Sequence, residues 1–144
     1  MAGIIESKGH MRRKKIIKTN EQWQLELSPE VYYICRLKGT ESPGSGQYDQ
    51  HFKDGTYNCA CCTAPLFSSS AKYEAQAGWP SFYEPISDTY VDYRRDRTGA
   101  LARVEIVCSA CHAHLGHIFN DGPKPTGYRY SINSLALDFT SSHS

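Results

Sequence analysis

Two pairs of cysteines share the same internal spacing, Cys59-x-x-Cys62 and Cys108-x-x-Cys111. Two residues between thiolates let both sulfurs reach one ion through a tight backbone turn, and two such pairs complete a tetrahedron around Zn²⁺. Four thiolates leave no open coordination position, so the spacing predicts a structural zinc rather than a catalytic one. The 45 residues between the pairs exceed the spacer of an isolated zinc finger, so the metal would join two distant parts of a larger fold.

Two other metal groups compete with zinc for these thiolates. Iron also accepts four sulfur ligands, and residues 108–112 match the C-x-x-C-H pattern of covalent haem attachment. Haem is disfavoured because the N-terminus has no apolar run typical of an export signal. In addition, Met1 and Met11 are the only methionines, both near the N-terminus, and the first cysteine pair would have no role. Zinc is therefore the predicted metal.

Three further segments bring unusual polar and aromatic residues into one small domain: residues 78–82 (GWPSF), 114–123 (HLGHIFNDGP) and 127–134 (GYRYSINS). Together with the cysteine pairs, they resemble the signature of the B-type methionine sulfoxide reductases, from about Glu21 to Phe139. The resemblance implies an oxidoreductase that reduces the R epimer of methionine sulfoxide, free or in proteins, through a sulfenic acid. It also implies protein repair under oxidative stress and recharging by thioredoxin. Six cysteines without an apolar leader segment favour a reducing, cytoplasmic location.

A site for this substrate must hold an apolar methyl group, polarise an oxygen and present a sulfur nucleophile. The flat ring of Trp79 suits the methyl group, and Phe119 would close the same apolar cage. His114 and His117 lie three residues apart and can face one pocket. Either imidazole would then donate a proton to the sulfoxide oxygen, and the resemblance points to both.

Two polar side chains complete the expected site. Asn133 can hydrogen-bond the substrate and hold an imidazole in place. Arg129 would lie on the same strand face as residue 131 and would favour a thiolate there. Each residue also has a purely structural explanation: the tryptophan as core, the histidines as packing residues or metal ligands, and Arg129 as a surface ion-pair partner. Residues 121–123 (DGP) are expected to be a simple turn.

The position of the nucleophilic cysteine in that family holds Ser131 in this chain. A hydroxyl is far less acidic than a thiol and cannot form a sulfenic acid. The sequence therefore predicts a chain that folds and binds substrate without turning it over. The serine is either natural in a non-catalytic relative or engineered to trap a substrate complex, and residues 1–10, which resemble an expression-vector remnant, favour engineering.

Recycling of a sulfenic acid calls for a second thiol. Some members of the family carry a resolving cysteine directly before the GWPSF segment, where this chain has Ala77. Outside the four metal-binding positions, the remaining thiols are Cys35 and Cys61. Because Cys61 lies within the first cysteine pair, Cys35 is the candidate resolving residue. A small buried hydrophobic role for Cys35, and recycling without a second cysteine, stay open.

Two other function classes fit parts of the sequence. A binding module on the same zinc-held β scaffold would hold a ligand in an aromatic cage without chemistry, as in scaffolds resembling the thalidomide-binding domain of cereblon, and Ser131 would suit it. A zinc ribbon that binds nucleic acid is disfavoured by the net charge of +1 and by the lack of a basic stripe on the strands.

A helical segment over residues 19–37 is predicted before the strands begin. Thr19 and Gln22 have the spacing of a capping box. Ser28, followed by proline, marks a second helix start, and Gly39 is expected to end the helical segment. Residues 40–55 are rich in turn residues and are predicted to form a loop with few packing residues. Strands are expected over residues 56–59, 81–83, 89–95, 102–108, 127–130 and 135–139.

The expected architecture is mainly β, with two antiparallel sheets stapled by the structural zinc and the N-terminal helices packed at one side. The 144 residues fit one domain. The predicted divisions are a flexible basic arm over 1–18, a reductase domain over 19–139 and a frayed tail over 140–144. No apolar run reaches the ~18 residues of a membrane span, and the domain is expected to act as a monomer.

Overall fold

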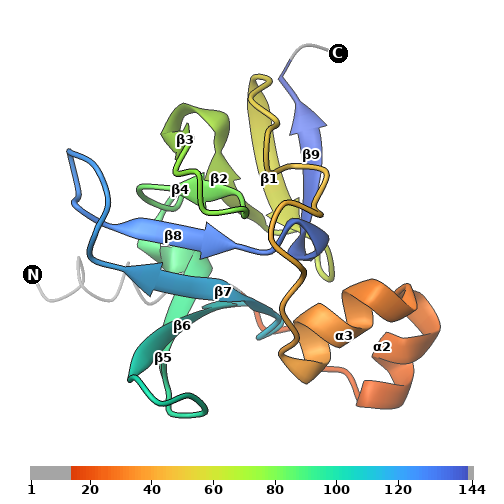
Figure 1. Ribbon diagram of the computed structural model, residues 1–144. Coiled ribbons are helices and arrows are strands. Elements are labelled where there is room, and N and C mark those ends of the chain that lie inside the picture. The colour runs from red at the N-terminus through yellow and green to blue at the C-terminus, as the bar shows by residue number, and fades with distance from the viewer. Residues whose placement is uncertain (1–13, 143–144) are drawn as a thin grey trace, which may run out of the picture.

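The computed structural model describes residues 14–142 and confirms a mainly β fold with two antiparallel sheets and, within that range, two α-helices beside them (Figure 1). Most of the expected arm and the end of the expected tail, residues 1–13 and 143–144, lie outside the described residues. From Lys15 onward the chain is bonded to the rest of the domain: Ile16 donates its backbone N–H to the carbonyl of Ala110 at 2.8 Å.

The helices α2 (Asn20–Glu26) and α3 (Pro29–Leu37) begin where the capping residues predict. Thr19 and Gln22 form a reciprocal capping box, and the Ser28 hydroxyl caps the second helix. Each side-chain bond satisfies a backbone N–H that has no partner inside its own helix. Local sequence therefore fixes both helix starts.

The end of α3 differs from the prediction. Lys38, not Gly39, takes the left-handed conformation after the helix, with φ of 61°. Gly39 is required for another reason, because a Cβ there would lie 2.1 Å from the ring of Tyr33. The glycine thus makes room for a side chain and does not supply a special turn.

The smaller sheet has three antiparallel strands, with β1 (Gly55–Cys59) between β2 (Pro65–Ser68) and β9 (Leu137–Ser141). The larger sheet has six, in the order β3 (Lys72–Tyr73), β4 (Ser81–Phe82), β8 (Arg129–Ile132), β7 (His114–Phe119), β6 (Arg103–Cys108) and β5 (Val91–Asp96). Three single turns of 3₁₀ helix link strands: η1 (Ser69–Ala71), η2 (Asp88–Tyr90) and η3 (Ser134–Ala136).

Strands β2, β3 and β7 are not among the strands expected from the sequence. The omission of β7 matters most, because this strand carries both His114 and His117. Its pairing with β6 shifts between Ile106 and Val107, which leaves Leu115 without a partner on β6. A β-bulge of this kind breaks the two-residue alternation that identifies strands in a sequence.

The loop between α3 and β1 contradicts the expectation of few packing residues. The Tyr48 ring meets the rings of His51 and Tyr57 edge-on, at centroid distances of 5.1 and 5.5 Å. The Tyr48 hydroxyl also accepts a hydrogen bond from the backbone N–H of Phe139 at 3.1 Å. The turn residues predict the path of the loop, but they do not reveal that its tyrosine packs against β1 and β9.

The hydrophobic core joins the two sheets. Phe67 of β2 and Phe82 of β4 stack with 4.4 Å between ring centroids, and both are fully buried. Helix α3 packs against β7 and η3, beside the larger sheet. Within residues 14–142, neither helix has the length and apolar character that crossing a bilayer would require.

Candidate active site and metal centre

The two cysteine pairs meet between the two sheets. Cys59 and Cys62 flank the turn from β1 to β2, and Cys108 and Cys111 flank the turn from β6 to β7. The closest Sγ–Sγ distances are 3.7 Å for Cys59–Cys111 and 3.6 Å for Cys62–Cys108, and all four sulfurs lie within 4.8 Å of one another. A tetrahedral zinc site with Zn–S bonds of about 2.3 Å has sulfur–sulfur edges of about 3.8 Å. The four thiols therefore fit a metal ion of this size.

Two cations hold the backbone of the second cysteine turn. Lys15 Nζ donates to the carbonyl of Ser109 at 2.6 Å, and Arg36 Nη2 donates to the carbonyl of Cys111 at 3.0 Å. Four thiolates around a divalent ion carry net negative charge, which neighbouring cations offset. The turn is thus fixed by contacts outside the metal site itself.

The two remaining thiols lie beside this cluster. Cys35, on α3, is only 3% exposed, and its contact with the Cys61 thiol, together with burial, raises the pKa of Cys35. Neither thiol is among the residues that line the pocket around Ser131. Direct attack by Cys35 on a group at position 131 would require α3 to move.

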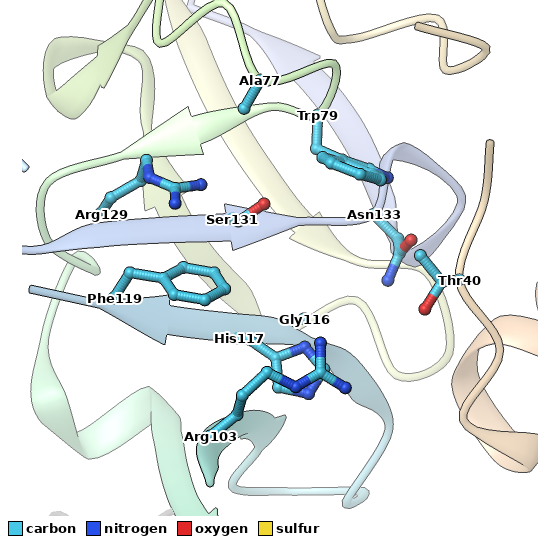
Figure 2. A pocket seen from close by; sticks show the side chains of 10 residues that line it. All are labelled: Thr40, Ala77, Trp79, Arg103, Gly116, His117, Phe119, Arg129, Ser131 and Asn133. Atoms are coloured by element: carbon cyan, nitrogen blue, oxygen red, sulfur yellow. The ribbon is translucent and has the colours of Figure 1, made fainter. Parts of the chain in front are cut away.

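A pocket of about 290 Å³ opens over β7 and β8 (Figure 2). Six of the eight predicted non-metal site residues line it, while His114 and Cys35 do not. Figure 2 shows the Ser131 hydroxyl pointing away from β8 into the space beside Arg129 and Trp79. The full lining comprises Thr40, Ala77, Trp79, Arg103, Gly116, His117, Phe119, Arg129, Ser131 and Asn133.

Strand pairing fixes the position of Ser131 in this pocket. The residue lies opposite Ser81 of β4 on one side and His117 of β7 on the other. Arg129, two residues earlier on β8, also lines the pocket, as the alternation of a strand predicts. Gly116 permits the close approach of β7, because a Cβ there would lie 1.9 Å from the Ser131 carbonyl oxygen.

Trp79 is held by the loop that follows α3. Its indole Nε1 donates to the backbone carbonyl of Glu41 at 3.1 Å. The Glu41 side chain, 7% exposed, accepts from the backbone N–H groups of Ser134 and Leu135 at 2.9 and 3.0 Å. Gly78, with φ of +96°, makes the turn that leads into the tryptophan. The loop, the indole and the start of η3 are therefore one hydrogen-bonded unit.

The imidazole of His117 is oriented by Asp96 at the end of β5. Nε2 of His117 lies 2.7 Å from Oδ2 of Asp96, and the same oxygen accepts from Nη2 of Arg103 at 3.2 Å. Hydrogen bonds from Thr98, and then from His117, hold the pKa of Asp96 below its usual range. Arg103 and His117 both line the pocket, so one carboxylate aligns two of its walls.

His114 lies behind His117, away from the pocket lining. Its Nδ1 is 2.7 Å from Oε2 of Glu105, and both side chains are almost completely buried. The two imidazole rings meet edge-on, 5.4 Å apart between centroids. Burial lowers the pKa of His114, and the Glu105 carboxylate opposes that shift only in part. The ring supports His117 and does not itself border the cavity.

Arg129, which also lines the pocket, contacts both a carboxylate and an aromatic ring. Its Nε and Nη2 donate to the two carboxylate oxygens of Asp121 at 2.8 and 3.1 Å. Its guanidinium carbon also lies 4.3 Å from the ring centroid of Phe119. The arginine holds the pKa of Asp121 below its usual range. The simple turn expected over residues 121–123 is wrong: the turn lies over residues 124–126, and Asp121 instead fixes a pocket side chain.

The side-chain amide of Asn133 bonds to backbone groups and not to a histidine. Its Nδ2 donates to the carbonyl of Leu115 at 3.0 Å, and its Oδ1 accepts from the N–H of Glu41 at 3.0 Å. Asn133 thereby ties β7 to the loop that carries the glutamate. The histidines are oriented by Glu105 and Asp96, which take the role suggested for Asn133.

Sequence reasoning missed the carboxylates that align the pocket: Glu41, Asp96, Glu105 and Asp121. Only Glu105 could have been found from the sequence pattern. The alternation over 102–108 puts it on the same strand face as Arg103, which lines the pocket. Glu105 is nevertheless 1% exposed, which is rare for a carboxylate without a partner. Asp96 and Glu41 depend on pairings 21 and more than 90 positions apart, and Asp121 meets Arg129 across the connection between β7 and β8.

Comparison with known proteins finds a matching family model and similar proteins. A family model described as the SelR domain matches residues 27–141. The chain is 54% identical over 125 residues to "Peptide methionine sulfoxide reductase MsrB" of Pseudomonas fluorescens, covering 87% of this chain and 96% of that protein. The protein of the same name from Acinetobacter baumannii is 54% identical over 123 residues, covering 85% of this chain and 88% of the relative. Among solved structures, the Mis18 'Yippee-like' domain is similar at a TM-score of 0.48 and 15% identity over 64% of this chain and 100% of that one, too distant to inform function.

Proposed function

The chain belongs to the SelR domain family, and we propose that its pocket binds the R epimer of methionine sulfoxide but that Ser131 blocks turnover. The observation that carries the proposal is the convergence of Trp79, His117 and Arg129 around Ser131 in one pocket. The curated relatives are named for reduction of peptide methionine sulfoxide. An indole, an imidazole and a guanidinium match the three parts of that substrate.

The substrate methyl group would pack against Trp79, with Phe119 closing the apolar side of the cavity. The indole is well placed for this contact because its N–H is already used by the backbone of Glu41. The sulfoxide oxygen would face His117, whose ring is held by Asp96. Arg129 would supply positive charge beside residue 131, partly offset by its contact with Asp121.

With cysteine at position 131, the reaction would proceed in two stages. The thiolate attacks the sulfoxide sulfur while His117 protonates the oxygen. The oxygen ends on the cysteine as a sulfenic acid, and methionine is released. Two thiol groups of a reductant then convert the sulfenic acid to the thiol and water, and become a disulfide. We propose thioredoxin as that reductant in the cell, in a reducing compartment such as the cytoplasm.

Serine cannot enter this sequence, because its hydroxyl is neither acidic enough to attack nor able to carry the oxygen as a sulfenic acid. The test compares the chain with its Ser131→Cys variant, using free methionine-R-sulfoxide and dithiothreitol as reductant. We expect both forms to bind the R epimer, and only the cysteine form to release methionine. The S epimer is the matched control. A folded, metal-loaded Ser131→Cys variant without turnover would contradict the proposal.

Recycling by a second cysteine of this chain has less support than direct reduction. Ala77 lines the pocket where some family members would carry a resolving thiol. Cys35, the candidate from the sequence, is buried against Cys61 on α3. Disulfide mapping of Ser131→Cys after one turnover distinguishes the alternatives: a 35–131 bridge supports Cys35, a 61–131 bridge supports Cys61, and no bridge supports direct recharging by the external dithiol.

The four-cysteine site would hold zinc as a structural ion. Cys59, Cys62, Cys108 and Cys111 would supply all the ligands, and none of them lines the pocket. Zinc would connect the two sheets and would take no part in the reaction. Metal analysis of the purified protein is expected to give one zinc per chain, and stoichiometric iron would contradict this assignment.

A second candidate function is favoured by Ser131 itself. A pocket with Trp79 and Phe119 but no thiol would suit a module that binds methionine sulfoxide, or another small polar group with a methyl, without converting it. The binding measurement described above separates the two: binding by the serine form with no turnover by the cysteine form would favour the module.

A further inference from the structure

Asp96 holds the His117 ring, and both of its carboxylate oxygens are engaged by hydrogen bonds. Oδ1 accepts from the N–H and the hydroxyl of Thr98 at 2.9 and 2.6 Å. Oδ2 accepts from Arg103 at 3.2 Å and lies 2.7 Å from Nε2 of His117. The side chains of Asp96 and His117 are 10% and 11% exposed, so water has little access to the contact between them.

These contacts determine which nitrogen of His117 carries its proton. An ionised carboxylate only accepts hydrogen bonds, and donors on both oxygens of Asp96 hold its pKa below the usual range. The proton in the 2.7 Å contact therefore belongs to Nε2 of the imidazole. In the neutral ring the other nitrogen, Nδ1, is then an acceptor.

We propose that Asp96 is a positioning residue that fixes the His117 tautomer with its proton on Nε2 and leaves Nδ1 to meet the bound sulfoxide. The identity of the ligand rests on the proposed function. In this arrangement Nδ1 delivers a proton only from the doubly protonated ring, whose positive charge the Asp96 carboxylate stabilises. The carboxylate acts through His117 and does not touch substrate.

The neighbouring histidine shows why this pair, and not the other, serves the pocket. His114 uses Nδ1 for its carboxylate, Glu105, so its ring is held by the opposite nitrogen. It is 4% exposed and does not line the pocket. Glu105 is further engaged by Lys38 at 3.3 Å. Asp96 is thus the carboxylate whose imidazole partner borders the cavity.

The Asp96→Asn variant tests the tautomer directly. An amide has one accepting oxygen and one donating nitrogen, so it cannot accept from both Thr98 and His117. If the oxygen keeps the Thr98 bonds, the NH₂ group faces Nε2 and moves the imidazole proton to Nδ1. In ¹⁵N-labelled chain carrying Ser131, at about pH 8.5, where an ordinary imidazole is neutral, the His117 nitrogen shifts should report Nε2–H. In Asp96→Asn they should report Nδ1–H.

Matched variants make the spectrum decisive. His117→Gln identifies the His117 signals by their loss, and Asp121→Asn changes another carboxylate at the pocket while leaving the His117 tautomer unchanged. A majority Nδ1–H form in the unsubstituted chain would overturn the inference. The same tautomer in the unsubstituted chain and in Asp96→Asn would overturn it as well.

Turnover gives a second, independent test in the Ser131→Cys background. Asp96→Asn should lower kcat about 100-fold, the low end of what a general acid contributes, with KM unchanged. Asp96→Glu should restore part of the loss, because it can again accept from His117. An unchanged kcat in a folded, metal-loaded Asp96→Asn variant would refute the inference. If Ser131→Cys is itself inert, the proposed function fails, and the nitrogen shifts still decide the role of Asp96.

Discussion

The cysteine cluster and the pocket over β8 are both assembled from distant parts of the chain, but they are held in different ways. Each cysteine pair sits on its own tight turn, and its spacing brings its two sulfurs together, although Lys15 and Arg36 also bond the backbone of the second turn. Several pocket side chains are held by hydrogen bonds to a further residue: Trp79 by Glu41, His117 by Asp96 and Arg129 by Asp121. The spacing of the cysteines therefore identifies the metal ligands in the sequence, whereas the positions of the pocket side chains depend on partners that spacing does not reveal.

The largest effect should come from the cluster. Structural zinc contributes an apparent ~10–16 kcal/mol in zinc-finger peptides, comparable with the whole ~5–15 kcal/mol stability of a domain. Cys62→Ser, or a strong chelator, should therefore abolish cooperative thermal unfolding. The control is Cys61→Ser, one residue away and outside the group of four. A Cys62→Ser chain that keeps both its metal and its transition would show that the two sheets do not need this link.

The next effect should be confined to the pocket. In the Ser131→Cys background, His117→Asn removes the proposed proton donor and should lower kcat about 100-fold or more. The unfolding temperature and the zinc content should stay nearly unchanged, because His117 lies outside the cluster. Turnover is followed by methionine release and stability by circular dichroism. Loss of metal in this variant would contradict the expectation that the pocket and the cysteine cluster are held independently.

A smaller effect is expected where the loop meets the pocket. Glu41→Gln loses one of two charge-assisted bonds to the start of η3, and a hydrogen bond to a charged group contributes about 1.5–3 kcal/mol. The free energy of unfolding in urea should fall by about 2 kcal/mol, with weaker binding of methionine sulfoxide because Trp79 is less constrained. The exposed Glu30, replaced in the same way, serves as the control and should change stability little.

The smallest effect concerns pH. Burial lowers the pKa of His114, so as the pH falls below about 6.5 the unfolded chain binds the proton first. Acidification should therefore lower the free energy of unfolding. The contribution of His114 is greatest above the pKa it has in the unfolded chain and declines as the pH falls toward its lower pKa in the folded protein. Urea unfolding at neutral and mildly acidic pH should show a shallower decline for His114→Gln than for the unsubstituted chain. Equal slopes would mean that His114 does not contribute.

Local patterns carried much of the fold prediction. The capping residues Thr19 and Ser28 fixed the helix starts, and cysteine spacing identified the ligand group, because both depend on neighbours within four residues. The alternating segment 102–108 likewise predicted β6. In each case the pattern that supports the prediction lies within a few consecutive residues.

Long-range pairings account for most of what could not be predicted. The residues around Glu41 predict only that it lies in a loop, because its hydrogen-bond partners, Ser134 and Leu135, are more than 90 positions away. His114 was expected in the pocket because of its spacing from His117, but the strand turns it toward Glu105. Asp96 follows a run of charged residues and gives no sign that an imidazole lies beside it.

The unpaired Leu115 on β7 has a consequence for anyone who would move this site to another protein. In a regular strand, side chains three positions apart emerge on opposite faces, so grafting the two histidines onto a flat host sheet would send one imidazole to the wrong side. The extra residue must travel with them, together with the Gly116 that lets the adjacent strand come near. The same residues in a strand without this bulge would keep both histidines but place their rings on opposite faces of the sheet.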